Sequence, residues 1–387
     1  MKVLIVCNSF FLKGNGLAAS ARTTAHYLRE AGVEVKILSM NNLDPEGPQP
    51  DFCLKKLYIP IFQKIVESEG YCFALSDDKV IREAVQWADV IHLEEPFILE
   101  KNVAKVAKEL GVPCVGTYHL HPENIFYTVG LGMMRLPNQL LLRFFRRCMF
   151  DWCTDIQCPT ENVMERLRSN NFKARLHLIP NGAVLEDGLR ERQETQQPQT
   201  DPYLIVCIGR LSREKDQMTL LRAIKRSKYR DEIQLFIAGQ GPHELAIKAK
   251  ALLMYKRGKI GLMPKFGFLS KEELLQLNKK AYLYVHCAVV EVEGLSCIES
   301  LQEGVVPIIA QGRLTATSQF ALCPKSLFPA RNAKALARRI DWWIEHPDYR
   351  AEMSAKYAES IFKYDIHNSI AKLIKMYQTA IRKYKRN

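Results

Sequence analysis

The sequence predicts an α/β protein built from two Rossmann-like domains that face each other across a cleft. Apolar runs of strand length alternate with helical patterns along almost the whole chain, which is typical of parallel sheets covered by helices. This alternation begins twice, at residues 2–7 and again at 203–210. A polar, proline-containing stretch at 186–202 separates the two series and indicates a linker. A length of 387 residues also suits two cores better than one.

The elements of the first series follow from local patterns. Lys2 is followed by the continuous apolar run 3–7, so we expect a buried strand over residues 2–7. A helix is predicted from about 17 to 31 and ends at Gly32, because glycine readily adopts the left-handed conformation that closes a helix. Further strands are predicted at 34–38, 89–93, 112–118 and 155–158.

The most informative segment of the chain is Glu291-Val-Glu-Gly-Leu-Ser-Cys-Ile-Glu299. A strand is predicted before it at 281–286, and a helix from about 295 to 303. A helix that begins after a glycine turn presents unpaired N–H groups that favour an anion. Glu291 would lie at the mouth of this site and Glu299 about two helical turns away. The pattern suits a nucleotide-sugar, although an ordinary βαβ unit with solvated glutamates has the same pattern.

Two cations follow the first strand of the second series. Arg210 offers a fork of donors and Lys215 a point charge, so together they can neutralise a diphosphate without a metal ion. Surface cations on a loop are the alternative for either residue alone. The glycine pair at 14 and 16 lets backbone approach a phosphate, but it lacks the third glycine of a dinucleotide fingerprint.

The order and spacing of short motifs along the chain resemble the retaining glycosyltransferases of family 4, which have the two-domain GT-B fold. The motifs are Ile179-Pro-Asn-Gly182, Gly209-Arg210-x4-Lys215, Ala238-Gly-Gln-Gly-Pro242, Gly267-Phe-Leu and Glu291-x7-Glu299. The resemblance implies an N-terminal acceptor-binding domain at 1–182, a linker at 183–202 and a C-terminal nucleotide-sugar-binding domain at 203–365. A last helix within 366–387 would return to the first domain.

The same resemblance assigns roles residue by residue. Arg210 and Lys215 would hold the donor diphosphate. Glu291 would contact hydroxyls of the transferred sugar, and Glu299 those of the ribose. His119 would lie near the reacting sugar, although a strand-end histidine that only packs shows the same pattern.

Backbone groups also receive roles from the resemblance. The amides of Gly294, Leu295 and Ser296 would cap a phosphate or the sugar, and Gly16 would bring the first domain's loop against the donor phosphates. Three positions depart from the family pattern, namely Asn15, Asp216 and Glu293. The glutamate stands where an aromatic or apolar residue is usual, which leaves the identity of the donor sugar open.

The implied chemistry is departure of a nucleoside diphosphate, and neither a metal ion nor a cofactor is expected to take part. Arg210, Lys215 and the helix-end amides would stabilise the developing charge. The acceptor hydroxyl would attack from the front face, with retention of configuration. The two-carboxylate scheme of glycoside hydrolases does not fit Glu291 and Glu299, because these two are spaced along a turn and helix.

The acceptor is suggested by an arginine-rich segment, residues 135–150. Helical spacing gathers its apolar residues into one broad arc, and Arg143, Arg146 and Arg147 fall on the other side. The arc consists of Leu140, Leu141, Phe144, Phe145, Cys148 and Met149. A helix lying on an anionic membrane surface has this pattern, as does a sheet-packed helix with a solvated face. A membrane lipid such as diacylglycerol is therefore the expected acceptor, with a lipid-linked or soluble saccharide of envelope polysaccharide as the alternative.

Composition bounds the remaining possibilities. A net charge of +13 points to an anionic partner, but nothing beyond charge favours nucleic acid. The sequence shows no bilayer-spanning run and no signal-peptide pattern, so a cytoplasmic protein bound to the inner membrane face is expected. The eleven cysteines lack zinc-type pairs and suit buried thiols. A non-catalytic GT-B module is a further alternative, whereas a nicotinamide-dependent dehydrogenase would need an acidic residue where Ser39-Met-Asn-Asn ends the second strand.

Overall fold

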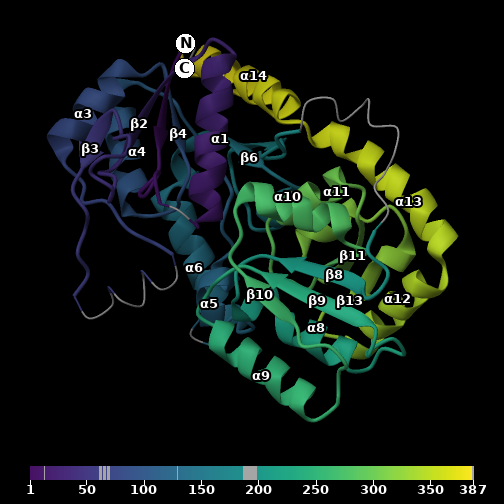
Figure 1. The fold of residues 1–387 in the computed structure, drawn as a ribbon. Coiled ribbons are helices and arrows are strands. Elements are labelled where there is room, and N and C mark those ends of the chain that lie inside the picture. The colour runs from purple at the N-terminus through teal and green to yellow at the C-terminus, as the bar shows by residue number, and fades with distance from the viewer. Residues whose placement is uncertain are drawn as a thin grey trace. The chain divides into compact units, whose positions relative to one another are not determined.

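A computed structural model describes residues 1–12, 14–60, 63, 67, 70–128, 130–185 and 198–385 (Figure 1). The chain divides into two compact units. Unit 1 comprises Met1–Gly182 with Ile366–Asn387, and unit 2 comprises Ala183–Asp365. Most of the stretch that the sequence identifies as a linker, residues 186–197, lies outside the described residues.

Unit 1 contains a seven-stranded parallel sheet in the order β3-β2-β1-β4-β5-β6-β7. Its strands are β1 (Lys2–Val6), β2 (Glu34–Met40), β3 (Phe52–Leu54), β4 (Val90–Leu93), β5 (Cys114–Thr117), β6 (Cys153–Cys158) and β7 (Arg175–Leu178). Its helices are α1 (Gly16–Glu30), α3 (Asp78–Trp87), α4 (Ile98–Leu110), α5 (Pro122–Thr128), α6 (Arg135–Cys148), η1 (Phe150–Trp152), α7 (Glu161–Ser169) and α14 (Ile366–Tyr384).

Unit 2 contains a six-stranded parallel sheet in the order β10-β9-β8-β11-β12-β13. Its strands are β8 (Tyr203–Ile208), β9 (Ile233–Ala238), β10 (Lys265–Gly267), β11 (Leu283–His286), β12 (Val306–Gln311) and β13 (Leu327–Pro329). Its α-helices are α8 (Gln217–Ile224), α9 (Glu244–Lys256), α10 (Lys271–Lys280), α11 (Leu295–Gln302), α12 (Ala333–Glu345) and α13 (Pro347–Ser360). Its 3₁₀ helices are η3 (Arg213–Lys215), η4 (Ala316–Phe320), η5 (Pro324–Ser326) and η6 (Ile361–Tyr364).

The two parallel sheets, each with its own helices, confirm the predicted α/β class of two Rossmann-like domains. The predicted strand at 281–286 is shorter in the structure, where β11 begins at Leu283. The first helix begins at Gly16, one residue earlier than predicted. Its start is fixed by Asn15, whose side-chain oxygen accepts hydrogen bonds from the amides of Leu17 (2.9 Å) and Ala18 (3.1 Å).

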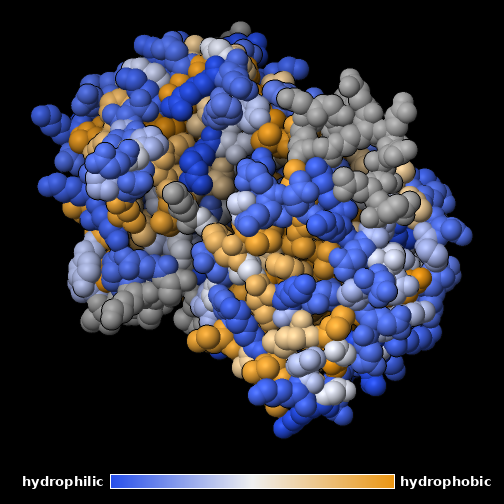
Figure 2. All heavy atoms as spheres, viewed as in Figure 1, coloured by the Kyte–Doolittle hydropathy of each residue, from blue (hydrophilic) through white to orange (hydrophobic). Residues whose placement is uncertain are grey.

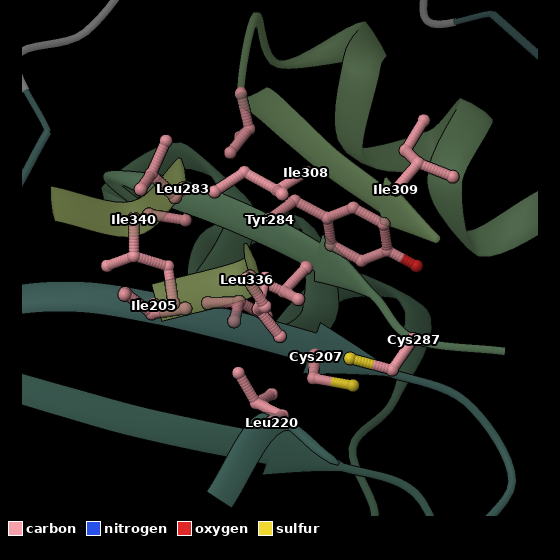
Figure 3. Close-up of a cluster of buried hydrophobic side chains, with 14 of the residues drawn as sticks. Ile205, Cys207, Leu220, Leu283, Tyr284, Cys287, Ile308, Ile309, Leu336 and Ile340 are labelled. Carbon is pink, nitrogen blue, oxygen red and sulfur yellow. The ribbon is translucent and has the colours of Figure 1, made fainter. Parts of the chain in front are cut away.

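The core of unit 2 is a close-packed cluster of aliphatic side chains between the sheet and a helix. Ile205, Leu283 and Ile308 lie on neighbouring strands, and Leu336 of α12 packs against the same cluster (Figure 3). All four side chains are fully buried, and burial of each aliphatic side chain stabilises the fold by about 1.5–3 kcal/mol. The loops at the strand ends are therefore carried by a close-packed frame.

The cysteines behave as the sequence predicts. All eleven are free thiols and nine of them are buried. Burial raises the pKa of the Cys114 thiol to about 12, so it stays protonated and unreactive at neutral pH. Within the described residues, no group of histidine, cysteine, aspartate and glutamate side chains is arranged to hold a metal ion.

A buried ion cluster at the edge of the unit 1 sheet yields a prediction about stability. The Asp155 carboxylate accepts hydrogen bonds from Arg175 (2.7 and 2.8 Å), His177 (2.7 Å) and Thr154 (2.7 Å). Burial alone would raise the pKa of Asp155, but these donors lower it to about 2. Because the folded-state pKa lies below the unfolded value, this carboxylate contributes about 2 kcal/mol above pH ~5 and loses that contribution as the pH falls towards 2.

We therefore expect Asp155→Asn to lower the free energy of unfolding by about 2 kcal/mol at pH 7 and by much less near pH 2. Thermal unfolding of both proteins at the two pH values measures the difference. A deficit of equal size at both pH values would show that lost packing, rather than lost charge, destabilises the variant.

Candidate functional site

In unit 2, two loops meet where the strand order reverses, between β8 and β11. Ligands of open parallel sheets bind at such a switch point, beyond the carboxyl ends of the strands. Lys215 reaches this point from the loop after β8, and Glu291 reaches it from the loop after β11. The Lys215 ammonium donates to the Glu291 carboxylate in an ion pair, so the structure brings these two predicted residues together.

A histidine contacts the Glu291 carboxylate, and a tyrosine contacts that histidine. His286, the last residue of β11, lies with Nε2 3.1 Å from Oε2 of Glu291. Its other ring nitrogen, Nδ1, lies 3.0 Å from the hydroxyl of Tyr284, which is also 3.0 Å from Oγ of Ser296. Ser296 in turn donates to the carbonyl of Ile208, 3.2 Å away. The start of α11 is thereby hydrogen-bonded to the ends of both switch-point strands.

The charge state of the pair follows from these contacts. Burial by itself would raise the pKa of Glu291, but the Lys215 ammonium and His286 outweigh it and hold the pKa of this carboxyl well below its usual range. Burial alone would lower the pKa of Lys215, and the Glu291 carboxylate reverses that direction, so the Lys215 pKa is raised. Both groups are therefore charged at neutral pH. The cluster presents a fixed cation beside a fixed anion.

The turn before α11 has the geometry of an anion site. Gly294 lies in the left-handed region with φ of 90°, and an added Cβ would be 2.5 Å from Oγ1 of Thr317. Only glycine meets both demands without strain. Within the described part of the chain, the amides of Leu295 and Ser296 donate no hydrogen bond, as expected in the first turn of a helix. These two N–H groups can receive a phosphate or sugar oxygen.

The glycines at 239 and 241 have a packing role. A Cβ on Gly239 would lie 2.0 Å from the carbonyl oxygen of Gly209, and one on Gly241 would lie 2.5 Å from that of Leu211. The loop after β9 can therefore approach the loop that carries Arg210 only because side chains are missing. The amide of Leu211 donates to the carbonyl of Gln240 at 3.0 Å and joins the two loops.

The other predicted donor residues occupy the same edge of the sheet. Arg210 is half-buried directly after β8, and its carbonyl accepts from Gln217 Nε2 at 2.8 Å. Glu299 is exposed on α11, and among the described residues its carboxylate forms no hydrogen bond or ion pair. Asp216 has φ of 49°, which explains why the family pattern has glycine there; its carboxylate accepts from the Thr219 hydroxyl at 2.7 Å.

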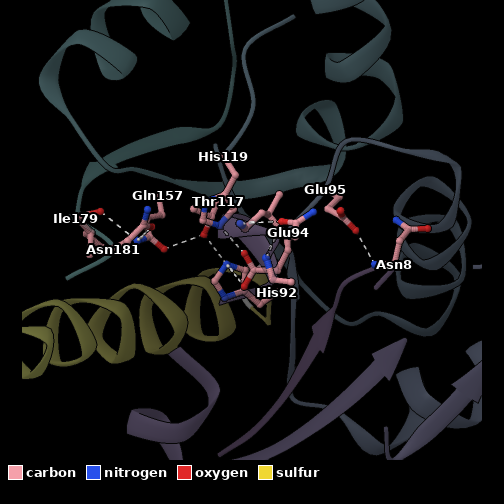
Figure 4. A network of polar contacts seen from close by, with 12 residues as sticks. Asn8, His92, Glu94, Glu95, Thr117, His119, Gln157, Ile179 and Asn181 are labelled. Carbon is pink, nitrogen blue, oxygen red and sulfur yellow. Dashed lines mark hydrogen bonds and ion pairs between the residues drawn. The ribbon is translucent and has the colours of Figure 1, made fainter. Parts of the chain in front are cut away.

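In unit 1, a buried polar network runs along the carboxyl ends of the strands, and it includes His119 (Figure 4). Nε2 of His119 lies 2.8 Å from Oε2 of Glu94, which directly follows β4. The other oxygen of Glu94 is 3.8 Å from Nε2 of His92. His92 also contacts the Thr117 hydroxyl at 2.7 Å and the hydroxyl of Tyr377 at 2.6 Å. Both side chains of the His119–Glu94 pair are more than nine-tenths buried.

Burial and neighbouring charges shift the pKa values of several groups in and near this network. Burial alone would raise the pKa of Glu94, but His92 and His119 lower it, so this carboxylate is charged beside the His119 ring. Burial lowers the pKa of His92, which is neutral at pH 7. At the switch point between β1 and β4, burial instead raises the pKa values of Glu95 and Glu100. The side chain of Asn8 donates to Glu100 at 2.9 Å.

The remaining predicted residues of unit 1 lie apart from this network along the chain. Gly16 opens α1, and a Cβ there would meet no atom within 4 Å, so the space above it is open. The predicted apolar arc of the 135–150 segment is divided in the structure. Phe145 and Cys148 are buried, whereas Leu140 and Phe144 are exposed.

The three arginines of α6 are not equivalent, although helical spacing places them on one side of the helix. Arg143 and Arg147 are exposed one helical turn apart. Arg146 is turned to Asp151, with Nε 3.1 Å from Oδ1. Asp151 lies just beyond the helix, and helical spacing does not reveal this partner.

Sequence reasoning missed His286, Tyr284 and Glu94 as parts of these clusters. A signal existed in unit 2: Tyr284 and His286 lie two residues apart, and so on the same face of a strand that ends shortly before Glu291. For Glu94 the only signal was a carboxylate directly after an apolar strand. Its partner His119 is contributed by a different strand loop, so sequence spacing could not pair them.

Comparison with known proteins gives the family. Residues 14–187 match the family model described as Glycosyltransferase Family 4, and residues 190–360 match the one described as Glycosyl transferases group 1. The chain is 24% identical over 325 residues to the alpha-monoglucosyldiacylglycerol synthase of Streptococcus pneumoniae, covering 81% of this chain and 71% of that protein.

Two solved structures are similar to this chain, and the first of them shares its fold. The Anabaena protein HepE in complex with UDP-glucose superimposes with a TM-score of 0.70 at 15% identity, over 97% of this chain and 100% of that one. The catalytic domain of cholesterol-alpha-glucosyltransferase from Helicobacter pylori is 44% identical over 42% of this chain and 99% of that domain, with a TM-score of 0.39. Two consecutive family models and two parallel Rossmann-like sheets together identify the chain as a hexosyltransferase that belongs to the family 4 glycosyltransferases of the GT-B fold.

Proposed function

We propose that this enzyme transfers a hexose from a nucleotide-diphosphate sugar, with UDP as the expected nucleotide, to a membrane-lipid acceptor such as diacylglycerol, and that it retains the anomeric configuration. The observation that carries the donor half is the Lys215–Glu291–His286 cluster beside the open amides of α11. At this one switch point, the cation can bind the diphosphate and the carboxylate can accept from a sugar hydroxyl. The unpaired N–H groups can donate to a phosphate oxygen.

Lys215 and Glu291 can both contact the donor while their own ion pair remains intact. The ammonium of Lys215 has three donor hydrogens, so it can bind a diphosphate oxygen while it stays paired with Glu291. Glu291, held charged by its two neighbours, can accept from a sugar hydroxyl. As the bond to the leaving diphosphate breaks, Lys215, Arg210 and the amides of Leu295 and Ser296 stabilise the growing negative charge. These groups need no reorganisation for that task, because the protein already fixes most of them.

The acceptor half would be completed in unit 1. We assign His119 to the surroundings of the reacting sugar, oriented by its hydrogen bond to the Glu94 carboxylate. Front-face attack by the acceptor hydroxyl, with the leaving phosphate taking the proton, then requires no carboxylate nucleophile. We assign the ribose hydroxyls to Glu299 and the close backbone approach to the donor to Gly16.

The lipid acceptor is supported by the exposed face of α6. Leu136, Leu140 and Phe144 follow one another at helical spacing and are 67%, 54% and 43% exposed. Arg143 and Arg147 are exposed on the same helix. Apolar side chains bordered by arginines match the interface of an anionic bilayer. Similarity to the alpha-monoglucosyldiacylglycerol synthase of Streptococcus pneumoniae supports the same acceptor class.

Peripheral binding on the inner membrane face follows from this proposal. Within the described residues, no helix is both long and apolar enough to cross a bilayer. The contact would then depend on α6, through side-chain insertion and charge rather than through a spanning segment.

The membrane half predicts a salt-sensitive loss of binding. Each exposed cation near an anionic surface contributes about 1 kcal/mol, so Arg143→Gln with Arg147→Gln should weaken vesicle binding roughly 30-fold. Co-sedimentation with anionic and with neutral vesicles measures this, and added salt should reduce the difference. Arg146→Gln is the matched control, because its side chain already has a carboxylate partner and should matter less.

Turnover tests the proposal as a whole. A panel of nucleotide-sugars is incubated with vesicles containing diacylglycerol, with vesicles containing a sterol, and with a soluble oligosaccharide, and release of nucleoside diphosphate is followed. We expect one UDP-sugar to be consumed only when a lipid acceptor is present. Consumption with the saccharide alone, together with no vesicle binding, would replace the lipid acceptor by a lipid-linked or soluble saccharide.

A further inference from the structure

A cationic cavity of about 280 Å³ lies in unit 2, between the ends of two helices. Its lining residues are Arg222, Lys225, Arg226, Lys250, Leu253, Met254, Arg257 and Lys259. The first three belong to the end of α8 and the residues just after it, and the others to the second half of α9 and the turn that follows. Figure 1 shows these two helices next to each other beneath the strands.

The cavity is separate from the donor site. In a parallel sheet, each connecting helix runs back from the carboxyl end of one strand to the amino end of the next. The C-terminal ends of α8 and α9 therefore lie at the amino edge of the unit 2 sheet. Lys215 and Glu291 lie at its carboxyl edge. The donor cluster and the cavity are thus on opposite edges of the same sheet.

The charge of the cavity is not explained by structure alone. Cations do stabilise the C-terminal ends of helices through the helix dipole, and Arg222 and Lys256 are placed for that. Six cations nevertheless line a single hollow in which no lining residue is acidic. All six are exposed, so solvent weakens their mutual repulsion, but together they create a local positive potential that attracts an anion. The lining therefore favours an anionic ligand.

The exposed surface of α9 indicates which anion. The helix buries Ile247, Ala251 and Met254, and it leaves Leu253, which lines the cavity, 42% exposed. Figure 2 shows hydrophobic and hydrophilic side chains mixed over this helix. A soluble phosphate needs only the cations. A phospholipid offers its phosphate to the cations and its glycerol and acyl region to the exposed Leu253 among them.

We propose that this cavity, lined by the ends of α8 and α9, binds the phosphate headgroup of an anionic phospholipid and gives unit 2 a membrane contact of its own. The contact differs from that of α6, which belongs to unit 1. The cavity takes no part in sugar transfer, so changes within it should alter membrane binding without altering recognition of the nucleotide.

The test compares two triple variants of the full chain with the same net charge. The cavity variant carries Lys225→Gln, Lys250→Gln and Arg257→Gln. The control variant carries Lys334→Gln, Arg338→Gln and Lys356→Gln, which are exposed cations of unit 2 outside the cavity. Both are measured by co-sedimentation with phosphatidylcholine vesicles, with and without phosphatidylglycerol, and by calorimetric titration with UDP.

We expect the cavity variant to bind the anionic vesicles up to about 100-fold more weakly than the wild type, which corresponds to about 3 kcal/mol. The control variant should lose only a small part of that affinity, and UDP titration should be unchanged in both. Equal losses in the two variants would overturn the proposal, because net charge alone would then explain binding. The comparison does not depend on α6, since both variants keep Arg143 and Arg147.

A second arm separates a lipid headgroup from free phosphate. The wild type and the cavity variant are titrated with inorganic pyrophosphate in the absence of lipid. Tight binding that the cavity variant loses, together with equal vesicle binding by both proteins, would assign the cavity to a soluble phosphate and overturn the lipid assignment. Weak pyrophosphate binding with a vesicle difference supports it.

Discussion

Lys215→Ala is expected to lower kcat by about 100- to 1,000-fold, which is the loss typical of removing one preorganised group that stabilises transition-state charge. The ammonium is held at the switch point by Glu291 and remains charged because that carboxylate raises its pKa. It can therefore act on the leaving diphosphate without any rearrangement. Arg210→Ala should also lower kcat sharply. Release of nucleoside diphosphate, measured at saturating donor, gives the value.

The fold must be shown to survive this change. Removing Lys215 leaves the Glu291 carboxylate largely buried without its cation, which by itself destabilises the protein. The double variant Lys215→Ala with Glu291→Gln removes both charges and restores stability if the single loss was structural. Lys334→Ala, an exposed cation of the same unit, is the control and should keep normal activity. Near-normal kcat in Lys215→Ala, or abolition of wild-type activity by a chelator, would contradict the assignment.

The second large effect is a division of labour between the two glutamates. Glu291→Gln should lower kcat about 100-fold while leaving the affinity for bare UDP within about threefold, because this carboxylate is assigned to the sugar. Glu299→Gln should weaken UDP binding about tenfold, the loss expected for one charge-assisted hydrogen bond to the ribose. Calorimetric titration with UDP and turnover of the UDP-sugar separate the two effects.

His286 provides a further test of this prediction, because its Nε2 lies 3.1 Å from Oε2 of Glu291. His286→Ala should reproduce part of the loss in kcat, since it frees the carboxylate to move, and it should leave UDP affinity unchanged. Equal loss of UDP affinity in the Glu291 and Glu299 variants would rule out separate roles for sugar and ribose.

Much of the fold was predictable because it depends on patterns that are local in the sequence. The apolar runs 3–7 and 204–207 are buried, as their composition predicts, and a glycine that ends a helix acts within one turn. The anion-binding turn at Gly294 was equally visible, since a strand, a glycine and a helix start follow one another directly. These features are properties of short segments, so one sequence suffices to find them.

Tertiary structure alone decided which side chains meet. The pairing of Lys215 with Glu291 joins residues 76 apart, and that of His119 with Glu94 joins the ends of β4 and β5. Asp151 sets Arg146 apart from Arg143 by folding back onto the helix end. The cavity between α8 and α9 likewise exists only because a parallel sheet places consecutive helix ends at one edge. Sequence determined the elements and their chemistry, and sheet order determined their partners, because contacts between strand ends depend on which strands are neighbours.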